Sequence, residues 1–266
     1  MERNMAQSID SIIERLGTVV AETRASQSPL GYFAALYRRV TIAVNEAIER
    51  GQFEDNGRME ALDVHFAGRY LTALEQFRNG QPTTESWHAA FEQTDNRKFI
   101  VLQHLLLGMN AHISLDLGIS AAAVADPADP MSLKNDFYAI NRILSSMIDD
   151  TQERLTRVFG PLGILDHLLG SVDEGFSMFS IEYARDKAWT QALELMAGGS
   201  GRRKTLIAER DRRVAEFSGK LVRPPKLSIR LLLGTVRMLE KGDTAWRIDV
   251  LNRRDTTGSL CETNLN

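Results

Sequence analysis

The sequence predicts an all-α fold, arranged as a single bundle-like domain of about eight to ten helices. Apolar residues recur at intervals of three and four along most of the 266-residue chain, which places them on one face of a helix. Alternating β-branched runs flanked by turn pairs, which predict strands, are nearly absent. The composition, with 43% apolar and 25% charged residues, is ordinary for a globular protein.

The first half of the chain divides at clear helix signals. Five helical segments are expected there, over residues 9–23, 32–50, 58–79, 86–94 and 99–125. Ser8 is the expected N-cap of the first segment, and Gly51 and Gly80 follow the second and third as C-terminal stop residues. Pro127 and Pro130 end the fifth, because the residue before a proline disfavours the helical region.

The second half is expected to hold four more helical segments, over 132–158, from 171 or 173 to 197, over 202–217 and, as the last helix, over 227–241. A short apolar turn is expected over 165–169, and a flexible connector at Gly198–Gly201. We therefore expect a main helical domain over 1–200 that carries the site, C-terminal helices over 201–252 packed back on it, and a mobile tail over 253–266.

Charge and composition argue against several functional classes. The net charge of −3 is unsuited to nucleic acid as the main partner, because phosphate binding needs a concentrated basic face. No uninterrupted apolar run is long enough to predict a membrane span, and the N-terminus lacks the apolar core of a secretory signal. Cys261, the only cysteine, suits a reducing compartment. These features predict a cytoplasmic protein whose partner is a small molecule, with its oligomeric state open.

The candidate site lies in the apolar segment 103–117. This segment holds His104 and His112, with Asp116 four residues after the second histidine. Ionisable groups in such a run must be paired, hydrogen-bonded or bound to metal, because burying them alone is unfavourable. On a regular helix His112 and Asp116 are one turn apart, whereas His104 lies about 12 Å from His112. Gly108, between the histidines, indicates a close approach of another backbone or of a ligand.

A second polar cluster contains His65 and Arg69, which share one helical face. Asp63 faces the opposite way and is expected to pair with Arg58 or Arg69. If this helix neighbours the one that carries His112, then His65, His112 and Asp116 would form a set of two histidines and one carboxylate, which suits zinc or iron. The structural alternative is that these histidines are hydrogen-bonded core residues.

Two further residues are candidates for substrate binding. Arg185, on a stripe with Trp189, could hold a carboxylate or phosphate, with a surface ion pair as the alternative. Asn110 points away from the His112 stripe and is expected to contact another helix or a buried backbone group. Asp149 and Asp150 are interpreted as part of a solvated face. Nucleotide-binding glycine loops, a serine nucleophile elbow and the His-Glu-x-x-His zinc motif are absent from the sequence.

Three stretches resemble a bacterial family of uncharacterised helical proteins, the domain-of-unknown-function family 5995. They are Leu62–Phe66, Leu102–Gly118 and Tyr183–Trp189, and the resemblance covers roughly residues 20–200. The resemblance implies no reaction. A remoter similarity, to helical zinc-dependent phospholipase C and nuclease proteins, is carried by His112 and Asp116, which match their His-x-x-x-Asp helix. The other histidines and the ligating N-terminal tryptophan of that group are missing here.

Three functions follow as hypotheses. The first is a small-molecule hydrolase or lyase in which His112 and Asp116 act as metal ligands or as a general base and its orienting carboxylate. His104 or His65 would then supply a third ligand or an acid, and Arg69 or Arg185 would hold an anionic substrate. The second is a non-haem iron oxygenase built on two histidines and a carboxylate. The third is a non-enzymatic helical binding or interaction protein.

Overall fold

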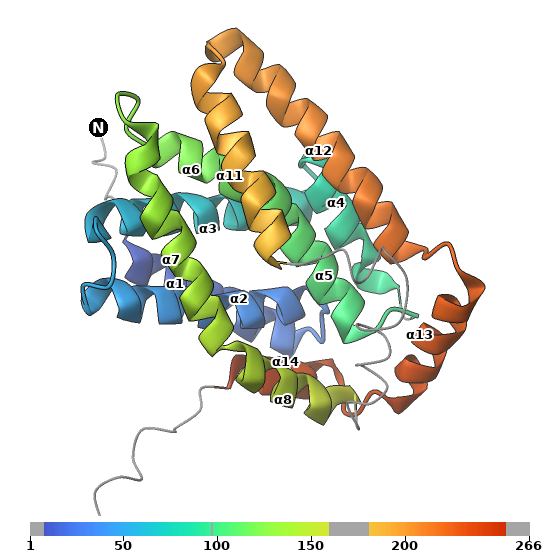
Figure 1. The fold of residues 1–266 in the computed structure, drawn as a ribbon. Helices are drawn as coiled ribbons and strands as arrows, with labels where there is room; N and C mark the ends of the chain where they lie inside the picture. The colour runs from blue at the N-terminus through green and yellow to red at the C-terminus, as the bar shows by residue number, and fades with distance from the viewer. Residues whose placement is uncertain (1–7, 97, 160–180, 254–266) are drawn as a thin grey trace, which may run out of the picture.

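The computed structural model describes residues 8–96, 98–159 and 181–253, and all regular structure in these ranges is helical (Figure 1). The all-α prediction is therefore confirmed for this part of the chain. Its described residues form eleven helices when the continuous helix Val101–Val124 is counted once. The small excess over the predicted count arises because one predicted helix is divided and a further helix follows the one expected to be last.

The three N-terminal helices lie where the sequence predicts them. They are α1 (Ile9–Ala25), α2 (Leu30–Glu49) and α3 (Asn56–Arg78). Ser8 caps α1, because its side chain accepts a hydrogen bond from the Ser11 N–H. Gly51 and Gly80 have φ of +66° each, in the left-handed region that glycine adopts without strain. The pattern of caps and stops thus set these boundaries correctly.

The most apolar predicted helix runs through the centre of the fold as α5 (Val101–Ala111), a π-helical turn η2 (His112–Asp116) and α6 (Leu117–Val124). It follows α4 (Glu85–Phe91) and the short 3-10 turn η1 (Glu92–Asp95). By length and composition Val101–Val124 could cross a membrane, but 83% of its most apolar stretch is buried inside the fold, as in a core helix. That finding is weak evidence for a span.

The periodicity predicted one helix over residues 132–158, but the structure has two. A 3-10 turn η3 (Pro130–Leu133) leads into α7 (Lys134–Ser146), and α8 (Ile148–Phe159) follows a break at Met147. The two helices serve different apolar clusters. Phe137 of α7 packs with Trp189, whereas Leu155 and Val158 of α8 pack in the cluster that contains Phe33. One straight helix could not present its apolar face to both clusters.

The C-terminal part of the chain holds one helix more than predicted, and α12 is longer than predicted whereas α13 is two residues shorter. They are α11 (Ile181–Ala197), α12 (Ser200–Val222), α13 (Leu227–Leu239) and α14 (Thr244–Asn252). The predicted flexible connector is wrong, because α12 already begins at Ser200 and only Gly198 and Gly199 separate it from α11. The last described helix is α14 and not 227–241. It begins after Asp243, whose side chain accepts a hydrogen bond from the Trp246 N–H.

The arrangement buries the central helix on several sides. Figure 1 shows α12 running down the right of the view toward α13, with α8 and α14 side by side below α2. The helix α12 packs on α4 and α5, while α14 packs on α1, α2 and α8. The predicted turn at 165–169, the predicted helix start at 171 or 173 and the tail beyond 253 lie outside the described residues.

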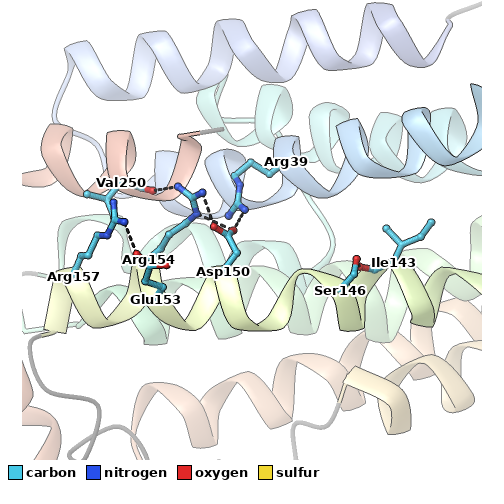
Figure 2. Close-up of polar contacts among 8 residues, drawn as sticks. All are labelled: Arg39, Ile143, Ser146, Asp150, Glu153, Arg154, Arg157 and Val250. Carbon is cyan, nitrogen blue, oxygen red and sulfur yellow. Dashed lines mark hydrogen bonds and ion pairs between the residues drawn. The ribbon is translucent and has the colours of Figure 1, made fainter. Parts of the chain in front are cut away.

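One polar cluster ties α2, α8 and α14 together (Figure 2). Asp150 accepts hydrogen bonds from Arg39 and, through both of its oxygens, from Arg154, which also donates to the Val250 carbonyl. The Arg154 side chain is 2% exposed. Asp149 is exposed as predicted, but the solvated-face interpretation is wrong for Asp150, which joins three helices.

Candidate functional site

The candidate site is built around a π-helical turn. Within η2 the Leu117 N–H donates to the carbonyl of His112, five residues back, in place of the four-residue spacing of an α-helix. His112 is 2% exposed and Asp116 is fully buried. The helix passes through Gly108 unbroken, and the π-turn begins at His112. Single π-turns of this kind occur often at functional sites.

Asp116 is held from two neighbouring helices. Its Oδ1 accepts a hydrogen bond from Arg69 Nε at 2.6 Å, and its Oδ2 accepts one from Trp87 Nε1 at 2.7 Å. Asp116 Oδ2 also lies 3.8 Å from His112 Nδ1. The carboxylate therefore joins α3, α4 and η2, with a charge-assisted bond to the guanidinium and an electrostatic contact to the imidazole.

His112 presents a buried imidazole with unused hydrogen-bonding capacity. Its ring stacks on Phe66 at a centroid distance of 3.5 Å and meets Tyr37 edge-on at 4.3 Å. Neither ring nitrogen has a hydrogen-bond partner in the described part of the chain. Burial lowers the pKa of His112, and the neighbouring Asp116 opposes that shift. The imidazole is therefore neutral near pH 7, with a nitrogen able to accept a proton.

His112 borders a partly open space, here called the central cavity, of about 260 Å³. Most of its wall is apolar, and the ionisable groups among the described lining residues are Tyr37, Asp63, His112 and Arg185. Three buried atoms, Tyr37 Oη, Asp63 Oδ2 and Arg185 Nε, have no hydrogen-bond partner among the residues that the structure describes. Burial raises the pKa of Asp63 to about 7. Unpaired buried polar groups are rare in folded proteins, and four around one cavity indicate a binding site.

Arg185, a predicted substrate-binding residue, lines the central cavity from α11. It is 4% exposed, its Nη2 donates to the Phe137 carbonyl, and its guanidinium lies 4.7 Å from the Phe137 ring centroid. Burial lowers its pKa to about 10, so it stays charged at neutral pH. The surface ion pair considered as its alternative is wrong, since Arg185 is buried and makes no ion pair with a described residue.

His65 and Arg69 line a different space, here called the open groove, of about 1170 Å³. His65 Nδ1 lies 2.9 Å from Ser120 Oγ, so α3 does neighbour the central helix as the two-histidine hypothesis required. However, His65 borders the open groove whereas His112 borders the central cavity. The described residues contain no group of three His, Cys, Asp or Glu side chains placed to hold a metal. The set of His65, His112 and Asp116 as metal ligands stays a prediction.

The predicted ion pair of Asp63 with Arg58 or Arg69 is absent from the described part of the chain. Arg58 pairs with Asp55 and Arg69 with Asp116. Asp63 instead points into the central cavity. Its position opposite His65 was predicted correctly, but its burial was not, because an ion pair with one of these arginines was expected.

His104 and Asn110 lie apart from the central cavity. His104 packs against the rings of Tyr32 and Phe99, and burial lowers its pKa to about 4. Asn110 donates hydrogen bonds of 3.0 Å to the Val214 carbonyl and to Ser218 Oγ, which confirms the expected contact with another helix. Their predicted catalytic and substrate-binding roles stay predictions.

The sequence reasoning missed two residues of the site. Trp87 holds Asp116 from α4, and Tyr37 contacts His112 from α2. Both are aromatic residues on apolar helical faces, where nothing in the local pattern distinguishes them from ordinary core residues. Only the pairing of distant helices reveals their contacts.

Comparison with protein-family models gives one match, which is described as "Family of unknown function (DUF5995)" and covers residues 9–224. The match is wider than the resemblance noted in the sequence and extends through the end of α12. No curated protein and no solved structure matches the chain. The remoter similarity to zinc-dependent phospholipases and nucleases thus has no support.

Proposed function

Because the chain belongs to the DUF5995 family, whose function is unknown, we propose an activity from the site alone: acid–base catalysis on a small, largely apolar molecule. The reaction is a hydrolysis or a lyase reaction in the central cavity, with His112 as the proton acceptor. One observation carries the proposal. His112 has two unpaired ring nitrogens, borders a cavity, and is backed by a buried carboxylate at 3.8 Å.

The surroundings of His112 meet the requirements of a general base. Such a base must be unprotonated before the reaction, and burial keeps the pKa of His112 low. When His112 accepts a proton from a substrate C–H group or from an attacking water, Asp116 stabilises the imidazolium that forms. The imidazolium then gives this proton to the leaving oxygen as its C–O bond breaks, so that an alcohol or water departs and neutral His112 is restored. Arg69 and Trp87 fix Asp116 in place and keep its charge available. The apolar wall strengthens this electrostatic effect.

The contacts of Asp116 favour an orienting role over a metal-ligand role. Its two oxygens already accept hydrogen bonds from a guanidinium and an indole N–H. A cation bound there would compete with the positive charge of Arg69 at short range. The zinc or iron hydrolase and the iron oxygenase both depend on Asp116 as a ligand, so they rank below the acid–base proposal.

A second candidate is a binding protein without catalysis. The mostly apolar lining of the central cavity favours it, because such a wall holds a ligand whether or not His112 reacts. Under this alternative, the polar atoms of Tyr37, Asp63 and His112 would only orient the ligand.

The test is a comparison of three proteins on two substrate panels. Short p-nitrophenyl esters report hydrolysis, and 3-hydroxy acids of six to eight carbons report loss of water. We expect turnover by wild type, a loss of about 100-fold or more in kcat/KM for His112→Asn, and retention of most activity by His104→Asn. His104 is the matched control, because it is a packed histidine of the same helix that does not line the central cavity.

The outcomes separate the candidates. If His112→Asn turns over either panel as fast as wild type while remaining folded by circular dichroism, the acid–base proposal is wrong. If wild type turns over neither panel but the same compounds raise its melting temperature, the binding protein is the better description. Metal analysis of the purified protein, with and without reconstitution, tests the zinc and iron hypotheses separately.

A further inference from the structure

We propose that the ligand of the central cavity is a small apolar carboxylic acid whose carboxylate is bound by Arg185. This inference rests on the proposed function only because both concern the central cavity. It adds the chemical class of the ligand. The residues that carry it belong to α7 and α11, whereas the acid–base groups belong to α2, α3 and η2.

Arg185 is a buried cation whose direct partners among the described residues are neutral. Within that part of the chain its guanidinium contacts the Phe137 carbonyl and the Phe137 ring, and its Nε has no hydrogen-bond partner there. A buried charge without a counter-ion is unfavourable by several kcal/mol or more, so proteins rarely keep one without a purpose. A ligand carboxylate would accept from Nε and remove this penalty.

The acids near the central cavity leave Arg185 unpaired. Asp63 is the acidic residue among the described lining residues, and it makes no ion pair with Arg185. Burial accounts for the raised pKa of Asp63, with no contribution from Arg185. Asp186 and Tyr138 act on Arg185 electrostatically, yet neither makes an ion pair or hydrogen bond to it. No acid of the described residues therefore occupies the position beside the guanidinium, which suits an anionic ligand.

The lining favours a carboxylate over a larger anion. Arg185 is the one Lys or Arg among the described residues around the cavity, and a single guanidinium matches the single charge and planar fork of a carboxylate. A phosphate dianion would need more positive charge. The other walls accept an alkyl or aryl chain, through side chains that include Leu36, Val40, Leu62, Leu105, Met109 and Ile140.

The size of the cavity limits the length of that chain. A volume of about 260 Å³ falls just below the range of pockets for drug-sized ligands, which is roughly 300–1,000 Å³. Acids of about six to ten carbons are therefore the expected class. Such a molecule, held by its carboxylate at Arg185, would place its chain in the cavity that His112 also borders.

Calorimetric titration of the full chain with octanoate, octan-1-ol and octyl phosphate tests the proposal. We expect wild type to bind octanoate about tenfold or more tightly than octanol. In Arg185→Gln the preference should fall below about twofold, and Arg185→Lys should keep an intermediate preference. The control is Arg210→Gln, because Arg210 also donates to a backbone carbonyl, that of Ser114, but does not line the cavity. This control should behave as wild type.

Equal binding of octanoate and octanol by wild type would overturn the inference, as would an unchanged preference in Arg185→Gln. Tighter binding of octyl phosphate than of octanoate would also overturn it, in favour of a phosphate ligand. If Arg185→Gln does not fold, Arg185→Lys carries the comparison. An Arg185-dependent preference for octanoate combined with unaltered turnover in His112→Asn would reject the proposed function alone.

Discussion

Nδ1 of His112 lies 3.8 Å from Oδ2 of Asp116, while that same oxygen accepts a hydrogen bond from Trp87 at 2.7 Å. The histidine and the aspartate are thus neighbours within one π-turn, but the direct hydrogen bonds to the aspartate come from α3 and α4. Asp116 connects the open groove, where Arg69 lies, with the wall of the central cavity, where His112 lies. A substitution at Arg69 should therefore change the position of the Asp116 carboxylate and, through it, the electrostatic environment of His112.

Arg69→Met tests this connection. The substitution leaves a fully buried carboxylate without its guanidinium partner. Because Arg69 itself is partly exposed in the folded protein, the free energy of unfolding should fall by only about 2 kcal/mol. Adding Asp116→Asn should recover part of that loss, which urea denaturation of the two single variants and the double variant measures as a coupling energy. Arg78→Met removes an exposed pair on the same helix and should change stability by less than about 0.5 kcal/mol. Purely additive effects of Arg69→Met and Asp116→Asn would contradict the connection.

Gly108→Ala should destabilise the protein, because a Cβ there would lie 2.6 Å from the Phe33 ring. Phe33 packs edge-on against Tyr70, Trp87 and His112, so it has little freedom to move. We expect a loss of about 1–3 kcal/mol in thermal or urea unfolding, typical of overpacking. Gly234→Ala is the matched control, since Gly234 is also helical but has open space around its Cβ position, and this variant should gain up to about 1 kcal/mol. A Gly108→Ala variant as stable as wild type would contradict this prediction and would show that the Phe33 ring can move away from the added methyl group at little cost.

The same glycine illustrates what the sequence could predict. Periodicity and caps determined α1, α2 and α3 to within about two residues, because their signals are local. Gly108 was expected to allow a close approach of another backbone or of a ligand, but the group that approaches it is the Phe33 ring, which no local pattern could name. Asp63 was placed opposite His65 on α3, and the two residues border different spaces. The helix boundaries and the placement of Asp63 depend on information within a few residues of each feature.

The features that the sequence did not predict depend on distant contacts. The π-turn at His112–Asp116 has no hydrophobic period of its own, and the break at Met147 follows from packing against two different clusters. Trp87 and Asp116 are 29 residues apart in the sequence, and Arg39 and Asp150 are 111 apart. Pairings of this kind are decided by tertiary packing, which overrides local propensity.

Asp150→Asn should weaken the junction of α2, α8 and α14 that Figure 2 shows. The loss of the carboxylate charge leaves the buried Arg154 guanidinium without the ion pair that both oxygens provide. We expect the free energy of unfolding to fall by about 3 kcal/mol. Asp149→Asn, at the exposed neighbouring position, should change it by less than about 0.5 kcal/mol. Equal effects of the two substitutions in urea denaturation would restore the solvated-face interpretation.

Asp63→Asn should raise stability at alkaline pH. The pKa of Asp63 is raised from 3.8 in the unfolded chain to about 7 in the folded protein, so the folded state holds a proton that the unfolded state has released. Stability from this group is therefore present below about pH 4 and is lost as the pH rises through 7, by up to about 4 kcal/mol. Urea denaturation at pH 5 and pH 8 should show the variant gaining on wild type as pH rises. Asp95→Asn, at an exposed position, is the control and should follow wild type at both values.

His104→Asn should have the opposite pH dependence. The pKa of His104 falls from 6.5 in the unfolded chain to about 4 in the folded protein, because burial and Arg237 disfavour the imidazolium. As the pH falls, His104 of the unfolded chain therefore binds a proton before His104 of the folded protein does. The contribution of neutral His104 to stability is complete above about pH 6.5. It is lost as the pH falls toward 4, and the loss amounts to about 3 kcal/mol. A neutral amide has no such loss, so urea denaturation at pH 7 and pH 4.5 should show His104→Asn gaining on wild type in acid. His88→Asn removes an exposed histidine and should run parallel to wild type. If His104→Asn also runs parallel, His104 is protonated in the folded protein and its packing between Tyr32 and Phe99 does not exclude the charge.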